Sequence, residues 1–156
     1  MADLDALTLI FLDLHVIVGP AETWLASRIA ELTGIEADMS SLSDTAPTLA
    51  AVAPLATSPT RVTGIGFIRK KETNRVAAVV TELRKLGIRA DEESDGFVVY
   101  PGRPQPGRVE TYDDHRMAMS FSVLGLAAHG IDILNPECVS KTFPEYFAEL
   151  EKLTGA

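Results

Sequence analysis

The side chains best suited to chemistry stand together in the stretch TYDDHRMAM, residues 111–119. Four ionisable residues follow one another there: Asp113, Asp114, His115 and Arg116. Two carboxylates, an imidazole and a guanidinium can bind an anion or move a proton. The stretch that follows is so apolar that a helix formed by it would be buried on all sides. Because unpaired charges are costly to bury, these side chains must meet each other, a ligand or water where that helix begins.

An ordinary structural role accounts for the same residues equally well. Asp113 or Asp114 can cap the helix, and Arg116 can pair with the carboxylate that is left over. The residues themselves leave the cap and the ligand site open as alternatives.

A second helix start carries a carboxylate in the same way. Ser43 or Asp44 can cap a small, apolar helix that runs from Thr45 to about Val52 and ends near Pro54. A cap is the simplest interpretation of Asp44, although this helix is also too apolar to lie on the surface.

A third helix start follows the charged run RKKETNR, residues 69–75. The helix is predicted over residues 74–86, with Thr73 as its cap. In a regular first turn, Lys71 and Arg75 would project to the same side with Glu72 beside them. Cations at a helix N-terminus oppose the macrodipole, so two of them there indicate an anion between them. The alternative is a charged run that is simply solvated.

The elements that must position these residues alternate between strand and helix. Buried strands are predicted over residues 7–18 and a helix over residues 21–33. Beyond the helices given above, the later elements are a strand over 60–68, a hairpin over 88–100, a strand over 109–112, a helix over 117–128, a strand over 131–134 and a helix over 139–150. We therefore expect an α/β unit repeated about twice, with helices inside and sheets around them.

Composition limits the function classes. The chain of 156 residues is 46% hydrophobic, which suits one compact domain. The net charge of -8 argues against nucleic acid as a partner. The single cysteine, Cys138, excludes an internal disulfide and a cysteine zinc cluster. The longest apolar run, residues 7–18, is too short to span a bilayer and is not a signal peptide. We expect a soluble protein of the cytoplasm that binds no membrane.

Five stretches occur together in an order and spacing typical of one known family: DMSSLSDTAPTLA, RKKETNR, TELRKLGI, TYDDHRMAMSFSVLGL and CVSKTFPEYF. They resemble the C-terminal domain of 5-enolpyruvylshikimate-3-phosphate synthase (3-phosphoshikimate 1-carboxyvinyltransferase). The resemblance covers about residues 32–152, and the combination is far more specific than any one motif. It divides the chain into a segment of uncertain match, 1–31, and a part of the C-terminal enolpyruvyl transferase domain, 32–156.

The resemblance implies a fold of repeated βαβαββ units with helices inside and mixed sheets outside, about two of them in this chain. It implies a transferase of the shikimate pathway to aromatic amino acids. Such an enzyme moves the enolpyruvyl group of phosphoenolpyruvate to the 5-hydroxyl of shikimate 3-phosphate and releases phosphate, without metal or organic cofactor. Family enzymes have two domains with the active site between them. The chain would thus be a fragment that needs the N-terminal half of the enzyme or self-association.

The resemblance also implies roles for single residues. Asp44 matches a carboxylate that contacts the shikimate hydroxyls and is a candidate base for the 5-hydroxyl. Lys71 matches a lysine near both substrates, Glu72 a candidate proton donor to the methylene carbon, and His115 a residue that orients its neighbours. Substrate binding is implied for Asp44, Lys71, Arg75, Asp114, Arg116 and Lys141, with the cations Arg75, Arg116 and Lys141 on phosphoenolpyruvate.

Two positions depart from the family pattern, and two other functions compete with the first. Phe67 stands where asparagine is common, which removes one substrate hydrogen bond, and Asn74 replaces a frequent aspartate. One alternative is a non-catalytic module that binds phosphoenolpyruvate, or the competing phosphonate glyphosate, without turnover. The other is an enolpyruvyl transferase with a different acceptor, UDP-N-acetylglucosamine, which the pairing of KET-x-R with DHRMAM disfavours.

Overall fold

The computed structural model describes residues 32–154. The strands predicted over residues 7–18, and nearly all of the helix predicted over 21–33, lie outside the described residues. The strands are β1 (Glu36–Asp38), β2 (Thr60–Thr63), β3 (Ala90–Glu93), β4 (Gly96–Val99), β5 (Gly107–Val109) and β6 (Ile131–Ile133). The α-helices are α3 (Ala46–Val52), α4 (Arg75–Lys85), α5 (His115–Ala127) and α6 (Tyr146–Thr154). Short 3-10 helices cover Ser43–Thr45, Ala53–Leu55, Gly66–Lys70 and Pro136–Lys141.

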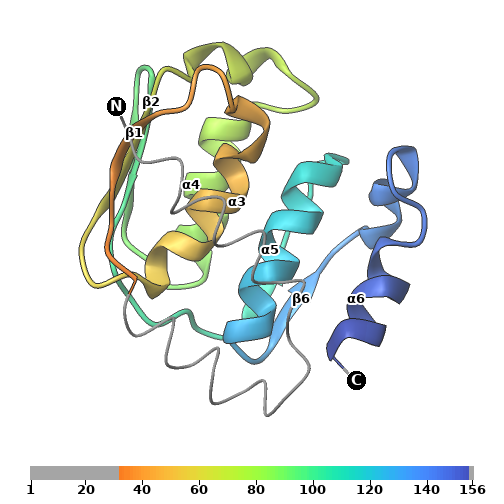
Figure 1. Ribbon diagram of the computed structural model, residues 1–156. Coiled ribbons are helices and arrows are strands. Elements are labelled where there is room, and N and C mark those ends of the chain that lie inside the picture. Colours follow the sequence, from red (N-terminus) through yellow and green to blue (C-terminus); the bar gives the residue numbers. More distant parts are fainter. Residues whose placement is uncertain (1–31, 155–156) are drawn as a thin grey trace.

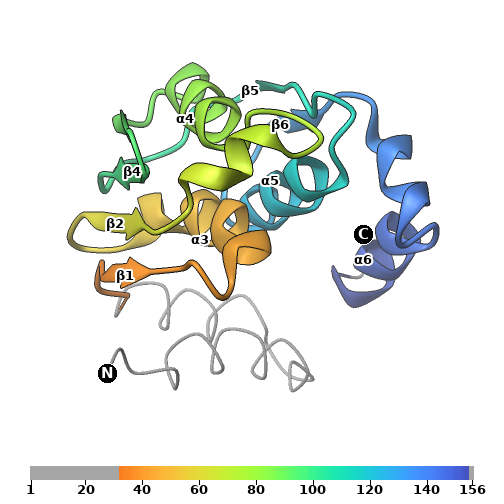
Figure 2. The same cartoon turned by 90° about the horizontal axis from the view of Figure 1, so that it is seen from above.

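The strands form two sheets around the central helices. The larger sheet has the order β1-β2-β4-β3, with β1 parallel to β2 and the other neighbours antiparallel. The smaller pairs β5 with β6 in parallel. Helices α3, α4 and α5 lie between the two sheets (Figures 1 and 2). Elements β1 to β4 with α3 and α4 make one complete βαβαββ unit, and β5-α5-β6-α6 makes the first part of a second. The predicted fold class is confirmed.

The apolar helices are internal, as their composition predicts. Helix α3 packs on α5, and both contribute buried side chains to one core. That core also takes in the buried face of α4 and the inner faces of the strands; its largest apolar members include Phe97, Phe121, Met39, Ile65, Ile68, Leu83 and Leu86.

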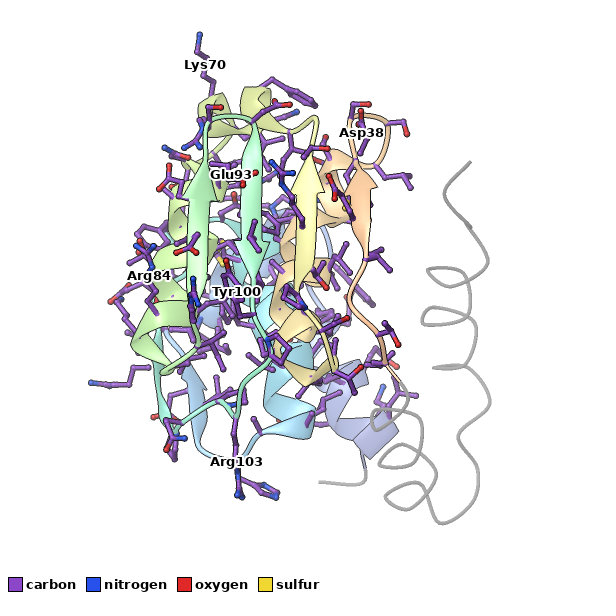
Figure 3. All side chains as sticks on the ribbon, turned by 90° about the vertical axis from the view of Figure 1, so that its left-hand side faces the viewer. Asp38, Lys70, Arg84, Glu93, Tyr100 and Arg103 are labelled. Carbon is purple, nitrogen blue, oxygen red and sulfur yellow. The ribbon has the colours of Figure 1, made fainter. Side chains whose placement is uncertain are left out.

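The outer face of the larger sheet meets solvent and carries paired charges. Arg61 on β2 donates from Nε to Glu93 at 3.0 Å and from Nη1 to Glu36 at 3.2 Å, which connects three strands. Figure 3 shows this face of the larger sheet, with the side chains of Glu93 and Tyr100 labelled over its strands. Among the helices described for residues 32–154, none is long and apolar enough to cross a membrane.

The predicted hairpin is confirmed, and its turn is fixed by Asp95. The Asp95 carboxylate accepts hydrogen bonds from the backbone N–H of Gly64 at 2.9 Å and of Gly66 at 3.0 Å. At the neighbouring position, a Cβ on Gly96 would lie 1.8 Å from the carbonyl oxygen of Val62. Only glycine therefore allows β4 to approach β2 this closely.

Several predicted boundaries differ from the structure. Strand β1 was not predicted, because three residues are too few to show an alternating pattern. The strand expected over 60–68 ends at Thr63 and gives way to a 3-10 helix, while the one expected over 109–112 ends at Val109. The last helix starts at Tyr146 instead of residue 139, since a 3-10 helix precedes it and Pro144 interrupts the chain.

Two predicted caps are also wrong. Asn74, and not Thr73, caps α4, accepting a hydrogen bond from the N–H of Ala77 at 3.1 Å. Neither Ser43 nor Asp44 caps α3, whose N-cap residue Thr45 makes no side-chain cap bond. A turn of 3-10 helix carries Asp44 instead and leaves its carboxylate available for other partners.

The packing of α5 yields a stability prediction. Phe121 on α5 is fully buried, whereas Leu126 on the same helix is 38% exposed. Replacing Phe121 with alanine leaves a cavity and should lower the free energy of unfolding by about 3–5 kcal/mol. Leu126→Ala is the matched control and should cost less than about 1 kcal/mol. Urea unfolding followed by circular dichroism measures both, and equal losses would contradict the assigned core.

Candidate functional site

The guanidinium of Arg75 lies at the centre of a cluster of carboxylates. It donates from Nε to Asp114 Oδ2 at 2.7 Å and from Nη2 to Asp114 Oδ1 at 3.2 Å, a two-point contact. The same group reaches Asp44 at 3.0 Å and Glu72 at 2.7 Å. The side chain is only 2% exposed, and that of Asp114 is fully buried. A guanidinium buried this deeply needs such partners.

The fold gathers these groups because α3, α4 and α5 begin at the same end of the molecule (Figure 1). Arg75 is the first residue of α4, and Asp114 is the N-cap of α5, where its carboxylate accepts from the N–H of Arg116 at 2.9 Å. Asp44, in the turn before α3, bridges two cations: it accepts from Arg75 and, through Oδ2, from Arg116 Nη2 at 3.1 Å.

The carboxylates around Arg75 favour the charged state of its guanidinium. Burial alone would lower the pKa of Arg75, but the hydrogen bonds and charge of Asp114, with the charges of Glu72 and Asp44, raise that pKa above its ordinary value. Arg75 is therefore a permanent cation around which carboxylates from three segments converge.

A further ion pair, between Lys141 and Asp113, lies next to Asp114 of the cluster. The ammonium group of Lys141 donates to Asp113 Oδ2 at 2.7 Å and to the carbonyl oxygen of Asp113 at 3.2 Å. The hydrogen bond and charge of Lys141 lower the pKa of Asp113, and the same contact raises the pKa of Lys141. Lys141 ends the 3-10 helix Pro136–Lys141, so it does not lie on the last helix as the sequence predicted.

Lys71 and His115 differ from the other predicted site residues. Lys71 has an extended backbone ahead of α4, so it does not share one helical face with Arg75 as a regular first turn would require. Its side chain is exposed and makes no ion pair within residues 32–154. His115 is buried, and within the described part of the chain its Nδ1 has no hydrogen-bond partner; the same holds for Arg116 Nε. Both nitrogens are shielded from solvent, so the start of α5 holds two polar atoms whose hydrogen-bonding capacity is unused among the described residues.

The structure thus brings together most of the residues that the sequence singled out: Asp44, Glu72, Arg75, Asp114 and Arg116, with His115 next to them. Lys141 joins through Asp113, a partner that sequence reasoning did not assign to it. Of the two alternatives for the DDHR stretch, the cap is confirmed at Asp114, whose carboxylate also binds Arg75. Arg116 pairs with Asp44 and not with the carboxylate that is left over, and the ligand site stays a prediction. Within residues 32–154, no group of three or more His, Cys, Asp or Glu is arranged to hold a metal ion.

A hollow of about 690 Å³ lies elsewhere. It is lined by the residues that follow α3 and α5 and by the loop 101–106, and it contains none of the predicted site residues. In Figure 3, Arg103 marks that loop at one end of the molecule. Lys70, two residues before Glu72 of the cluster, marks the opposite end. The charged cluster, with its buried Arg75 and Asp114 and its half-exposed Asp44 and Glu72, is distinct from this hollow.

The fold and the charged cluster define a mixed α/β domain of the enolpyruvyl transferase type. The sequence model of EPSP synthase (3-phosphoshikimate 1-carboxyvinyltransferase) matches residues 3–150. The chain belongs to the EPSP synthase family.

Individual relatives agree with this assignment. The chain is 49% identical over 125 residues to the 3-phosphoshikimate 1-carboxyvinyltransferase of Trichormus variabilis, covering 80% of this chain and 29% of that protein. It is 44% identical over 133 residues to that of Shewanella woodyi, covering 85% and 31%. The solved structure of EPSP synthase from Acinetobacter baumannii superposes with a TM-score of 0.70 at 31% identity, covering 78% and 30%. The chain thus spans less than a third of the length of these relatives.

Asp113 and Asp114 offer a matched pair of variants. Asp114→Asn keeps a side chain that can cap α5 but removes the charge that faces buried Arg75, so it should lower the free energy of unfolding by about 3–5 kcal/mol. Asp113→Asn, next to it on the exposed surface, should leave that free energy nearly unchanged. Urea unfolding compares them, and a mild Asp114→Asn would show that the buried pair contributes little.

The Lys141 contact generates a pH prediction. Lys141→Gln should raise the pKa of Asp113 toward its ordinary value, because the cation and its hydrogen bond are lost. Since the folded-state pKa of Asp113 is depressed, this exposed pair contributes a small stabilisation above the ordinary aspartate pKa, which is lost as the pH falls through the depressed value. Carboxyl ¹³C NMR titration measures the shift. Lys152→Gln, which removes the distant pair with Glu149, is the control and should leave Asp113 unchanged.

Proposed function

We propose that this chain supplies part of the active site of a 3-phosphoshikimate 1-carboxyvinyltransferase, with phosphoenolpyruvate and shikimate 3-phosphate as substrates. The observation that supports it is the meeting of Arg75, Arg116 and three carboxylates from separate helix starts, in a chain of the EPSP synthase family. The net reaction joins the 5-hydroxyl oxygen to C2 of phosphoenolpyruvate, breaks the bond from C2 to the phosphate oxygen and transfers the hydroxyl proton to the leaving phosphate.

The cations of the cluster suit the anionic substrate. Phosphoenolpyruvate is a compact polyanion, and guanidinium groups bind carboxylate and phosphate in two-point contacts. In the proposed complex, Arg75, Arg116 and Lys141 hold it. The Arg116 side chain is 37% exposed and is held through Nη2 by half-exposed Asp44, so its guanidinium can take the anion by exchanging that partner.

Binding at Arg75 requires an exchange of partners. Its guanidinium already donates to Glu72 and Asp44, two half-exposed carboxylates that can swing into solvent, while buried Asp114 stays in place. An arriving anion would take the donors that Glu72 and Asp44 release. The displaced carboxylates would then lie beside the substrate, where they can accept and deliver protons.

The proton-transfer roles follow from that arrangement. Asp44 is the proposed base for the 5-hydroxyl, and Glu72 the proposed proton donor to the methylene carbon. The methyl group so formed gives up one proton again as the bond from C2 to the phosphate oxygen breaks, which restores the methylene group of the product. Lys71, which is exposed next to Glu72 in the chain, would approach both substrates when they are bound. His115 would orient its neighbours from its buried position at the start of α5.

The chain needs further parts to complete the site. Since it spans less than a third of its relatives, we propose that the rest of such an enzyme, or a second copy of this chain, supplies the remaining ligands. No metal or organic cofactor is required, and the proposed location is the cytoplasm. The competing proposal is a module that binds phosphoenolpyruvate or glyphosate without turnover, and the short span favours it for the chain by itself.

Phosphate release from phosphoenolpyruvate plus shikimate 3-phosphate tests the proposal. The chain should be nearly silent by itself and active when the missing N-terminal portion of a relative is added, because orientation by both parts makes the chemistry possible. In the active mixture, Arg116→Ala should reduce the rate at least about 100-fold, as expected for loss of a charge-assisted contact to the reacting anion.

Arg103→Ala provides the matched control, since this exposed arginine lies at the opposite end of the molecule. It should retain full activity. Silence in both mixtures together with saturable binding of phosphoenolpyruvate would favour the non-catalytic module, and silence without binding would overturn both proposals.

A further inference from the structure

Glu82 on α4 is a fully buried carboxylate that the proposed reaction does not use. Three donors surround it and make four hydrogen bonds: Lys85 Nζ reaches both oxygens at 2.9 and 3.0 Å, the backbone N–H of Glu110 lies at 3.1 Å and the Tyr112 hydroxyl at 2.5 Å. A buried carboxylate is retained only with such partners. Two of these partners belong to the segment between β5 and α5, which leads directly into the site.

That segment has an uncommon backbone. Tyr112 and Asp113 both have φ of 55°, in the left-handed region that side chains other than glycine, asparagine and aspartate seldom adopt. Such a conformation persists only where the surroundings fix it. Glu82 fixes it twice, at the Glu110 backbone before the turn and at the Tyr112 side chain within it. The turn then closes through the N–H of Asp114 on the carbonyl oxygen of Thr111 at 2.9 Å.

Helix α4 therefore holds this segment at two points. Arg75 and Glu82 are seven residues apart, or two turns along one face of the helix. Arg75 binds Asp114 just after the left-handed pair, and Glu82 binds Glu110 and Tyr112 just before and within it. Because helix α4 is rigid, its two contacts fix the positions of the residues between Glu110 and Asp114. These include Asp113, which faces Lys141.

We infer that Glu82 is a positioning residue: through Tyr112 and Glu110 it holds the turn 112–114 so that Asp114 meets Arg75 and Asp113 meets Lys141. The inference rests on the proposed function in that it concerns the same site, but Glu82 itself touches no substrate. Burial, and then the hydrogen bond and charge of Glu82, raise the pKa of Tyr112, which keeps its hydroxyl a donor throughout the neutral range.

A purely local role is the competing explanation. Glu82 and Lys85 form an i,i+3 pair within α4, and this pair could stabilise that helix without any effect on the site. The two roles differ in where the protein loosens when a partner of Glu82 is removed. Positioning predicts loosening at the turn and at the start of α5, whereas a local role predicts loosening along α4.

Amide hydrogen exchange of the whole chain, followed by NMR without substrate, separates them. Tyr112→Phe removes one hydroxyl and keeps the ring, so it should fold. It should speed exchange about tenfold at Asp114 and Arg116, whose amides depend on the turn and on the Asp114 carboxylate. The Arg75 Nε–H resonance, which reports the contact with Asp114, should shift in the same variant. Glu82→Gln should have the larger effect at these sites.

Tyr100→Phe is the matched control, since the Tyr100 ring lies under the Arg89 guanidinium on the outer face of the larger sheet. It should leave exchange at Asp114 and Arg116 within twofold of the parent. Unchanged exchange there in Tyr112→Phe, or equal acceleration of the α4 amides around Leu83, would overturn the inference even if Glu82→Gln fails to fold. Because no substrate is present, the result does not depend on whether the chain supports turnover.

Discussion

The buried guanidinium of Arg75 is the constraint on which the rest of the site depends. A charge that is 2% exposed is tolerable only if carboxylates reach it, and these come from the turn before α3, the residues before α4 and the cap of α5. Each of the three helices must therefore begin at the same end of the molecule and at the right depth. The sheet and the apolar core satisfy this demand by holding α3, α4 and α5 side by side.

The cluster combines a fixed part with an adjustable part. Asp114 is fully buried, caps α5 and accepts two hydrogen bonds from Arg75, so it is the fixed part of the cluster. Asp44, Glu72 and Arg116 are partly open to solvent and share their contacts with Arg75 or with each other. This division suits a site that must release internal ion pairs to admit an anion and yet keep the central cation in place. Lys141, at the end of the 3-10 helix Pro136–Lys141, adds a positive charge next to the cluster through its pair with Asp113.

Much of the fold could be predicted from the sequence because the apolar helices and the Asp95–Gly96 turn have strong local signals. The motifs around Asp44, Arg75 and Arg116 also identified the family. The partner of each charge could not be predicted in the same way. Asp44 resembles an ordinary cap locally, and its true contact with Arg116 spans 72 positions. The left-handed pair at Tyr112 and Asp113 was equally hidden, since tyrosine gives no signal for positive φ.

The loop 101–106 joins the complete βαβαββ unit to the partial second unit, at the end of the molecule away from the charged cluster. The covalent link between the units and the electrostatic link between them are therefore physically separate. Changes in the length or composition of this linker need not alter the spacing of the helix starts, which the core and the ion pairs set independently. A reporter dye or affinity handle attached at exposed Arg103 in this linker would therefore leave the charged end of the domain undisturbed.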